Sequence, residues 1–271
     1  MSSVTQAKRI VVKVGTSTLT YENGKLNIRA IESLCKVLSD LQNAGRQIIL
    51  VSSGAIGVGV GKLGLRERPC ETREKQAVAA VGQCELMFIY DKLFGEYNHT
   101  VAQILLTRRV MENDHTKQNV INTFGTLLDM GIIPVVNEND TVAIDELVGA
   151  NYGDNDTLSA IVATIVDADL LVLLTDIDGL YDADPHTNPD ARHIPLVTAL
   201  DDSILALAGG AGSKRGTGGM ATKLRAAQLT MPAGIPTVIT EGSHPERLYD
   251  LLEGKPVGTL FQPDAGMKSS R

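Results

Sequence analysis

Residues 9–14 read RIVVKV, a short run of mostly β-branched residues that stops at Gly15. Similar apolar runs recur along the chain, separated by segments with helical spacing: QIILVSS (47–53), VAQILLT (101–107), IIPVVN (132–137), LLVLLT (170–175) and TVIT (237–240). Strands that are apolar throughout and alternate with helices indicate a mostly parallel sheet covered on both faces. The sequence therefore predicts an α/β fold, a three-layer αβα sandwich with an open central sheet.

The segments between these runs carry the start and stop signals of helices. Asn27 can cap a helix that Gly45 ends, with apolar residues at helical spacing between them. Asn23-Gly24 predicts a tight hairpin turn within residues 17–26, and GTLF (258–261) predicts an edge strand. Further helices are expected over about 71–94, before Gly131, from Asp156, and near 199–208, 220–232 and 245–253.

The composition bounds the domain count and the partners. The 271 residues contain no Pro- or Ser-rich linker, so one compact domain is expected over residues 1–262, with a disordered tail over 263–271. Aromatic residues make up 4% of the chain and Trp is absent, which argues against a stacking platform for nucleic acid. The net charge of −7 argues against binding to phosphate backbones. We expect no nucleic-acid partner.

Cysteine and histidine usage indicates a reducing compartment and no metal site. Cys35, Cys70 and Cys84 have no metal-ligand spacing, and the five His residues are scattered. The first residues, MSSVTQAKR, lack the apolar core of a signal peptide, and no apolar run is long enough to cross a bilayer. The sequence predicts a cytoplasmic protein without membrane association.

Two acidic runs, NEND (137–140) and GDND (153–156), lie beside stretches that are expected to be buried. Unpaired carboxylates would be costly there, so positive groups or hydrogen-bond donors should meet them. In parallel sheets, ligands bind beyond the carboxyl ends of the strands. The residues that follow strands, and that we therefore expect to share one crevice, are Lys13, Ser53, Asn137 to Asp140, and Asp176.

The glycine-rich stretch SSGAIGVGVGKLG (52–64) allows two interpretations. Gly59, Gly61 and Gly64 match the dinucleotide pattern G-x-G-x-x-G by count. A helix should open inside that motif, but LRERPCE follows instead, so we favour a chance match. What remains is a strand end at Ser52–Gly54, either with backbone N–H groups that face an anion or as a plain flexible loop.

Two further stretches suit a nucleotide. GGAGSKRGTGGMATKLRAA (209–227) places glycines directly before a helix whose first turns contain Lys223, an arrangement that favours polyphosphate binding. Its alternative is a mobile surface loop. Thr175 and Asp176 end a strand and precede the turn at Asp178-Gly179, which fits a nucleotide-contacting loop or simple turn chemistry.

Together these motifs resemble the amino acid kinase family. The matching pieces run in family order from about residue 9 to 261: VVKVGTSTLT, VSSGAIGVG, AAVGQ, LLTR, PVVNENDTVA, GDNDTLSA, LLTDIDGLYDADP, GTGGMATK and VGTLF. VNEND followed by GDND resembles the branch that phosphorylates glutamate. The resemblance implies that ATP phosphorylates the γ-carboxylate of L-glutamate by direct in-line transfer, as the entry step of proline synthesis.

The resemblance also assigns roles to individual residues. It implies that Lys13 and Lys223 are catalytic and that Asp156 orients them. The implied substrate-binding residues are Ser53, Asp140 and Asn155, with Asp154 nearby. The implied nucleotide-binding residues are Lys13, Gly15, Thr175, Asp176, Thr217, Gly218, Gly219, Met220 and Lys223. Mg²⁺ is expected on the phosphates and water rather than in a protein cage.

Regulation and assembly are expectations from the same resemblance. It implies a short form without the family's C-terminal PUA domain, proline as feedback inhibitor, and a homo-oligomer, either a dimer or a tetramer. Three alternatives stay open: another small carboxylate acceptor such as acetylglutamate, a noncatalytic sensor of amino acids or nucleotides, and a dinucleotide-dependent oxidoreductase that rests on the glycine match.

Overall fold

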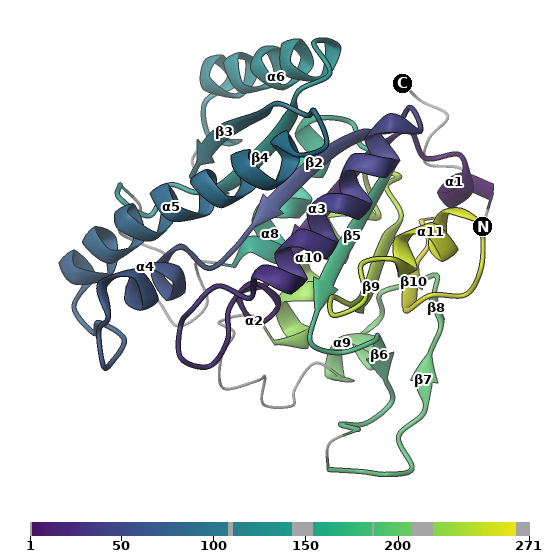
Figure 1. Cartoon of the computed structure of the whole chain (residues 1–271). Helices are drawn as coiled ribbons and strands as arrows, with labels where there is room; N and C mark the ends of the chain where they lie inside the picture. The colour runs from purple at the N-terminus through teal and green to yellow at the C-terminus, as the bar shows by residue number, and fades with distance from the viewer. Residues whose placement is uncertain (1, 108–110, 143–153, 186, 208–218, 264–271) are drawn as a thin grey trace.

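The computed structural model describes residues 2–107, 111–142, 154–185, 187–207 and 219–263. Its centre is an eight-stranded sheet in the order β3-β4-β2-β1-β5-β9-β10-β8 (Figure 1). Neighbouring strands are parallel except for β9 and β10, which are antiparallel. The bounds are β1 Arg9–Val14, β2 Gln47–Ser52, β3 Val101–Leu106, β4 Ile133–Glu138, β5 Leu170–Thr175, β8 Leu196–Val197, β9 Thr237–Glu241 and β10 Thr259–Phe261. A separate small hairpin pairs β6 Leu180–Tyr181 with β7 His193–Ile194.

Helices cover both faces of this sheet, so the predicted three-layer sandwich is confirmed (Figure 1). One face packs against α3 Ile28–Asn43, α4 Ala55–Leu63, α5 Thr72–Gly95 and α11 Arg247–Leu252. The other packs against α6 Asp114–Asp129, α8 Asn155–Ile165 and α10 Met220–Thr230. The short helices are α1 Ser2–Thr5, α2 Thr16–Leu19 and α9 Asp202–Ala206. Of the tail predicted over 263–271, only Pro263 lies within the described residues.

The alternation of side chains along β1 decides where its lysine lies. Val12 and Val14 pack into the core under α3 and α5, whereas Val11 packs into the core under α8 and α10. Successive side chains of a strand point to opposite faces, so Lys13 lies on the same face as Val11. The strand therefore delivers one ammonium group to the α8 and α10 layer at its carboxyl end.

Two local predictions were wrong in detail. The predicted turn at Asn23-Gly24 is present, since the Gly24 N–H donates to the Tyr21 carbonyl. The paired strands of the hairpin are reduced to one bridge between Thr20 and Leu26, because the chain turns helically in α2 directly after β1. The N–H groups of Thr18 and Leu19 donate to the Gly15 carbonyl and hold that turn. Strand β10 is not the edge of the sheet, since β8 pairs on its outer side. A two-residue strand such as β8 leaves no periodic signal in the sequence.

The glycine-rich stretch that follows β2 forms helix α4, which the sequence analysis did not predict. Its glycines allow close packing of helices. A Cβ on Gly59 would overlap the Val78 carbonyl of α5, and a Cβ on Gly82 of α5 would overlap the Ala55 carbonyl of α4. The match to G-x-G-x-x-G therefore falls inside a helix that touches its neighbour by backbone, which removes the structural basis of the dinucleotide interpretation.

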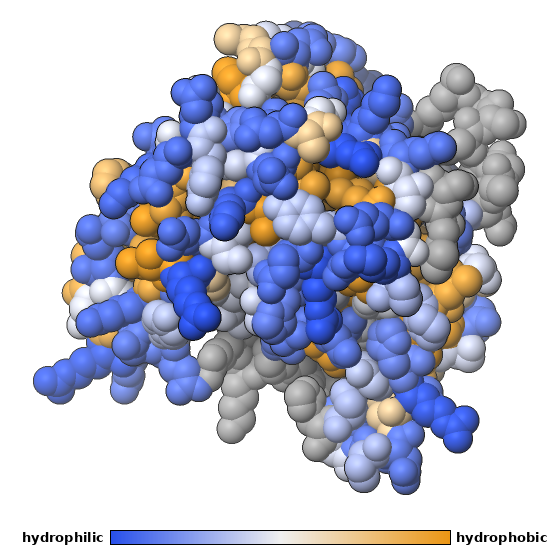
Figure 2. Space-filling model, turned by 45° about the vertical axis from the view of Figure 1, so that its right-hand side comes forward, coloured by the Kyte–Doolittle hydropathy of each residue, from blue (hydrophilic) through white to orange (hydrophobic). Residues whose placement is uncertain are grey.

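The visible surface is mostly hydrophilic, with apolar residues in smaller groups between the polar ones (Figure 2). Within the described ranges, no helix combines the length and the apolar character needed to cross a membrane.

The contact between α4 and α5 generates a stability prediction. Gly82→Ala should lower the free energy of unfolding by about 2 kcal/mol or more, because the added methyl group forces two helix backbones apart. The matched control is Gly125→Ala in α6, where a Cβ meets nothing within 4 Å. There Ala should be neutral or stabilising by up to about 1 kcal/mol. Urea unfolding followed by circular dichroism measures both, and equal effects would contradict the packing role.

Candidate active site

A buried carboxylate joins two lysines where β1, α8 and α10 meet. Lys13 Nζ lies 2.7 Å from Asp156 Oδ1, and Lys223 Nζ lies 3.2 Å from Asp156 Oδ2. Lys13 comes from the end of β1, Asp156 from the first turn of α8 and Lys223 from the first turns of α10. Lys13 and Lys223 are both far from Asp156 in the sequence, yet each places its ammonium group against one of the two carboxylate oxygens.

Burial makes this cluster electrostatically strong. Asp156 is fully buried, and both lysines are less than a tenth exposed. Burial alone would raise the pKa of Asp156, but Lys13 and Lys223 outweigh it and hold that pKa well below its ordinary value. The hydroxyl of Thr222 also donates to Asp156 Oδ2, at 2.8 Å. Asp156 is therefore charged at neutral pH, and its position is fixed by three donors.

A second polar cluster lies at the ends of β2 and β4. Asn155 Nδ2 lies 2.9 Å from Ser53 Oγ, 3.0 Å from the Ser52 carbonyl oxygen and 3.1 Å from Asn137 Oδ1. Asn155 is the residue before Asp156, so the two clusters are adjacent at the start of α8. The structure thus brings Ser53 and Asn155, both predicted to bind the acceptor, into direct contact.

The other two predicted acceptor residues, Asp154 and Asp140, are close in sequence to Asn155 and Asn137 of this cluster. Asp154 caps α8, because its carboxylate accepts from the Asp156 N–H at 2.9 Å and from the Thr157 hydroxyl at 3.1 Å. Burial, followed by the charge of Asp156, raises the pKa of Asp154. Asp140 lies two residues beyond the end of β4 and is half-buried. The acceptor roles of both stay predictions.

The predicted nucleotide residues lie at the ends of neighbouring elements. A Cβ on Gly15 would lie 3.7 Å from Lys13 Nζ, so the backbone passes close to this ammonium group. Thr175 ends β5, and its hydroxyl donates to Asp176 at 3.0 Å. Gly219 and Met220 begin α10. Thr217 and Gly218 lie outside the described residues.

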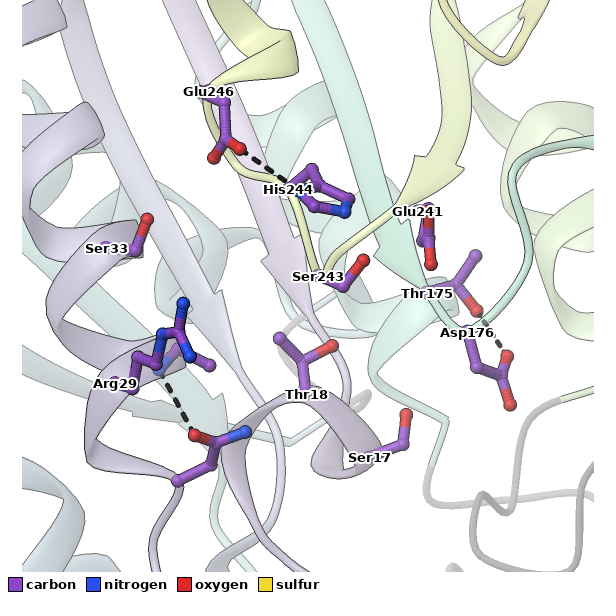
Figure 3. Close-up of a pocket in the computed structure, with 12 residues that line it drawn as sticks. Ser17, Thr18, Arg29, Ser33, Thr175, Asp176, Glu241, Ser243, His244 and Glu246 are labelled. Atoms are coloured by element: carbon purple, nitrogen blue, oxygen red, sulfur yellow. Dashed lines mark hydrogen bonds and ion pairs between the residues drawn. The ribbon is translucent and has the colours of Figure 1, made fainter.

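A groove of about 880 Å³ opens beside the nucleotide residues (Figure 3). Figure 3 shows Arg29 and Ser33 of α3 on one side of it, with Ser243 and His244 on the other. The groove shares Thr175 and Asp176 with the predicted nucleotide site, whereas the two lysines and Asp156 do not line it. No sequence motif marks this groove, because its walls come from four separate segments of the chain.

Sequence reasoning missed two polar contacts of the site. Thr222 contacts Asp156, and Gln83 accepts from Asn137 Nδ2 at 2.7 Å. Both residues fall within the motifs that carry the family resemblance, but no spacing rule singles them out. Among the described residues, no three His, Cys, Asp or Glu side chains gather as metal ligands.

The pairing of Asp156 generates a stability prediction. Asp156→Asn should lower the free energy of unfolding at neutral pH by about 3 kcal/mol or more, because two buried ammonium groups lose their counter-charge. The folded pKa is depressed, so the carboxylate stabilises the fold fully above its unfolded pKa of about 3.9 and loses this effect as the pH falls towards the folded pKa. The difference in the free energy of unfolding between wild type and Asp156→Asn should therefore decrease by about 1 kcal/mol at about pH 3.

Urea unfolding at several pH values measures this difference. The control is Asp250→Asn, which removes an exposed carboxylate paired with Lys255 and should change stability by less than about 1 kcal/mol. A difference for Asp156→Asn that stays constant from pH 6 to pH 3 would contradict the ion-pair account.

Comparison with known proteins assigns the family. The model of the amino acid kinase family matches residues 8–241. The chain is 59% identical to the glutamate 5-kinase of Clostridium perfringens over 261 residues, 96% of this chain and 97% of that protein. It is 56% identical to the glutamate 5-kinase of Listeria innocua, over 96% of this chain and 94% of that protein.

A solved structure shares the fold at much lower identity. It is a carbamate kinase from Giardia lamblia bound to AMP-PNP, with a TM-score of 0.65 and 18% identity over 96% of this chain and 100% of that chain. On the family model and the two relatives, the chain belongs to the amino acid kinase family.

Proposed function

We propose that this chain is an ATP-dependent kinase that phosphorylates the γ-carboxylate of L-glutamate, giving L-glutamyl 5-phosphate in the first step of proline biosynthesis. The observation that carries the proposal is the contact of Lys13 and Lys223 with one buried carboxylate, Asp156. The high identity to glutamate 5-kinases over nearly the full chain supports the choice of glutamate as acceptor.

Charge neutralisation is the task that the two lysines suit. A carboxylate acceptor and a terminal phosphate are both anions, and they repel each other as they approach. Phosphoryl transfer needs positioning and electrostatic stabilisation more than covalent chemistry. Two lysines bring positive charge into a site that is nearly dry, where charge acts strongly on anions. This arrangement supports direct in-line transfer without a covalent enzyme intermediate.

The two lysines have different proposed roles because they come from different elements. Lys13 lies near the backbone of Gly15 and contacts Asp156, the residue after Asn155, so it would bridge the transferring group. Lys223 lies near the start of α10, whose N-terminus favours phosphate, and would stabilise the leaving side. Asp156 keeps the two ammonium groups separate and oriented. Thr175, Asp176, Thr217, Gly218, Gly219 and Met220 complete the proposed nucleotide side.

The acceptor side is proposed at the second polar cluster. Ser53 and Asn155 supply a hydroxyl and an amide within 2.9 Å of each other, next to Asp156. Asp140 and Asp154 supply carboxylates that suit the ammonium group of an amino acid. An acceptor held there would lie beside the lysine pair, as the transfer requires.

Mg²⁺ is proposed to enter on the nucleotide. Mg²⁺ retains water and binds phosphates readily, which favours a place on the phosphates over a protein cage. When bound, it would neutralise phosphate charge. Inhibition by proline, assembly into a dimer or tetramer, and a cytoplasmic location stay predictions that rest on the family resemblance alone.

A coupled ADP-release assay across several acceptors tests the proposed function. L-glutamate should support turnover, and acetylglutamate and aspartate should support it far less, because the site is proposed for a free amino acid with a γ-carboxylate. The same assay without acceptor is the control. Turnover that favours acetylglutamate would contradict the acceptor assignment, and ligand binding without ADP release would favour the sensor alternative.

Substitution of the lysines tests the mechanism. Lys13→Ala and Lys223→Ala should each reduce kcat about a hundredfold, since one lost transition-state interaction is worth about 3 kcal/mol. Lys255→Ala is the matched control, because Lys255 is exposed and pairs with surface carboxylates. Thermal melts verify that each variant folds. Near-normal kcat in folded Lys13→Ala and Lys223→Ala would refute their catalytic roles.

A further inference from the structure

Three side-chain amides link the two helix layers around the ends of β2 and β4. Gln83 belongs to α5 on one face of the sheet, Asn137 to the end of β4, and Asn155 to the start of α8 on the other face. Asn137 Nδ2 donates to Gln83 Oε1 at 2.7 Å, and Asn155 Nδ2 donates to Asn137 Oδ1 at 3.1 Å. Gln83 and Asn137 are buried.

Backbone groups at two points identify the nitrogen and the oxygen of all three amides. The Ser52 carbonyl can only accept, so the Asn155 atom 3.0 Å from it must be nitrogen. The Glu138 N–H can only donate, so the Asn137 atom 2.9 Å from it must be oxygen. The Asn137 nitrogen then points to Gln83, so the Gln83 atom that accepts this hydrogen bond must be oxygen. The usual ambiguity of amide orientation is absent here.

The orientation determines what Asn155 offers to a ligand. Its nitrogen is surrounded by three protein acceptors, and within the described chain no donor pairs with its oxygen. The hydroxyl of Ser53 accepts from Asn155, which leaves the Ser53 proton to donate elsewhere. Asn155 therefore presents an acceptor and Ser53 a donor. An amino acid complements this pair, with an ammonium group that donates and a carboxylate that accepts.

We infer that Gln83 is a positioning residue: through Asn137 it holds the Asn155 amide so that Asn155 Oδ1 meets the ammonium group of the acceptor. This inference rests on the proposed function, since it takes glutamate as the acceptor. Gln83 contacts no substrate in this arrangement. Through Asn155, its side chain adds to recognition of the α-ammonium group beside the Asp140 and Asp154 carboxylates, and the lysine pair performs the transfer independently of it.

Removing the Gln83 acceptor loosens the chain of amides at Asn137. Without Gln83 Oε1, the Asn137 nitrogen loses its buried partner, and the Asn137 amide is then held through its oxygen alone, by the Glu138 N–H and by Asn155. Asn155 then has a less firmly held partner on that side, while Ser52 and Ser53 still accept from its nitrogen. One lost buried hydrogen bond corresponds to about a fivefold to tenfold change in affinity. The loss should fall on ligands that carry the ammonium group.

The test compares glutamate with glutarate, which is glutamate without its ammonium group. In Gln83→Met, which keeps side-chain length but has no strong acceptor, the KM for glutamate should rise about tenfold while kcat changes less than about threefold. The Ki of glutarate as a competitor should stay nearly constant. The ratio of glutarate Ki to glutamate KM should therefore fall about fivefold or more.

Gln83→Glu is the conservative control. It retains an oxygen acceptor for Asn137 and should keep the wild-type ratio. Asn137→Ala interrupts the same chain from β4 and should repeat the loss of selectivity, so the test stands if Gln83→Met does not fold. A folded Gln83→Met or Asn137→Ala that weakens both ligands equally, or neither, would overturn the inference and leave the proposed function intact. A wild type with no glutamate-dependent ADP release would overturn both.

Discussion

The salt bridges of Asp156 are the interaction on which the site depends. A fully buried carboxylate is costly unless it is paired, and here each oxygen faces a lysine from a different element. The same pairing also stabilises the lysines, because two buried ammonium groups this close would repel each other without an anion between them. The fold therefore has to bring β1, α8 and α10 together with little error.

The parallel sheet produces this precision through side-chain alternation. Val11 and Lys13 face one helix layer, and Val12 and Val14 face the other. The alternation that buries the valines of β1 therefore also determines the direction of its lysine. Ser53 lies two residues after Val51, so its side chain points to the same face of the sheet as Val51. On that face it contacts Asn155 of α8. The polar residues of the site thus follow from the core pattern of the strands that end there.

The sequence predicted the layers, the parallel strands and the strand-end position of the site, because apolar runs and helical spacing are strong signals. It did not predict helix α4, since glycines read as a loop when their packing partner is unknown, and that partner, α5, is identified only by three-dimensional contacts such as Gly59 with Val78. The two-residue strand β8 was missed because it is too short for periodicity. The contact of Gln83 with Asn137 joins residues 54 positions apart, and no spacing rule reaches that far.

The contact between α4 and α5 has a mechanical consequence. Where side chains separate two helices, rotamer changes absorb small displacements, but at Gly59 and Gly82 backbone meets backbone and nothing compliant lies between. Helices α4 and α5 should therefore move together as one rigid body. Gly54 starts one of them directly after Ser53, and the other contains Gln83. A displacement of α5 should therefore move α4 with it, and so affect both the chain after Ser53 and the position of Gln83.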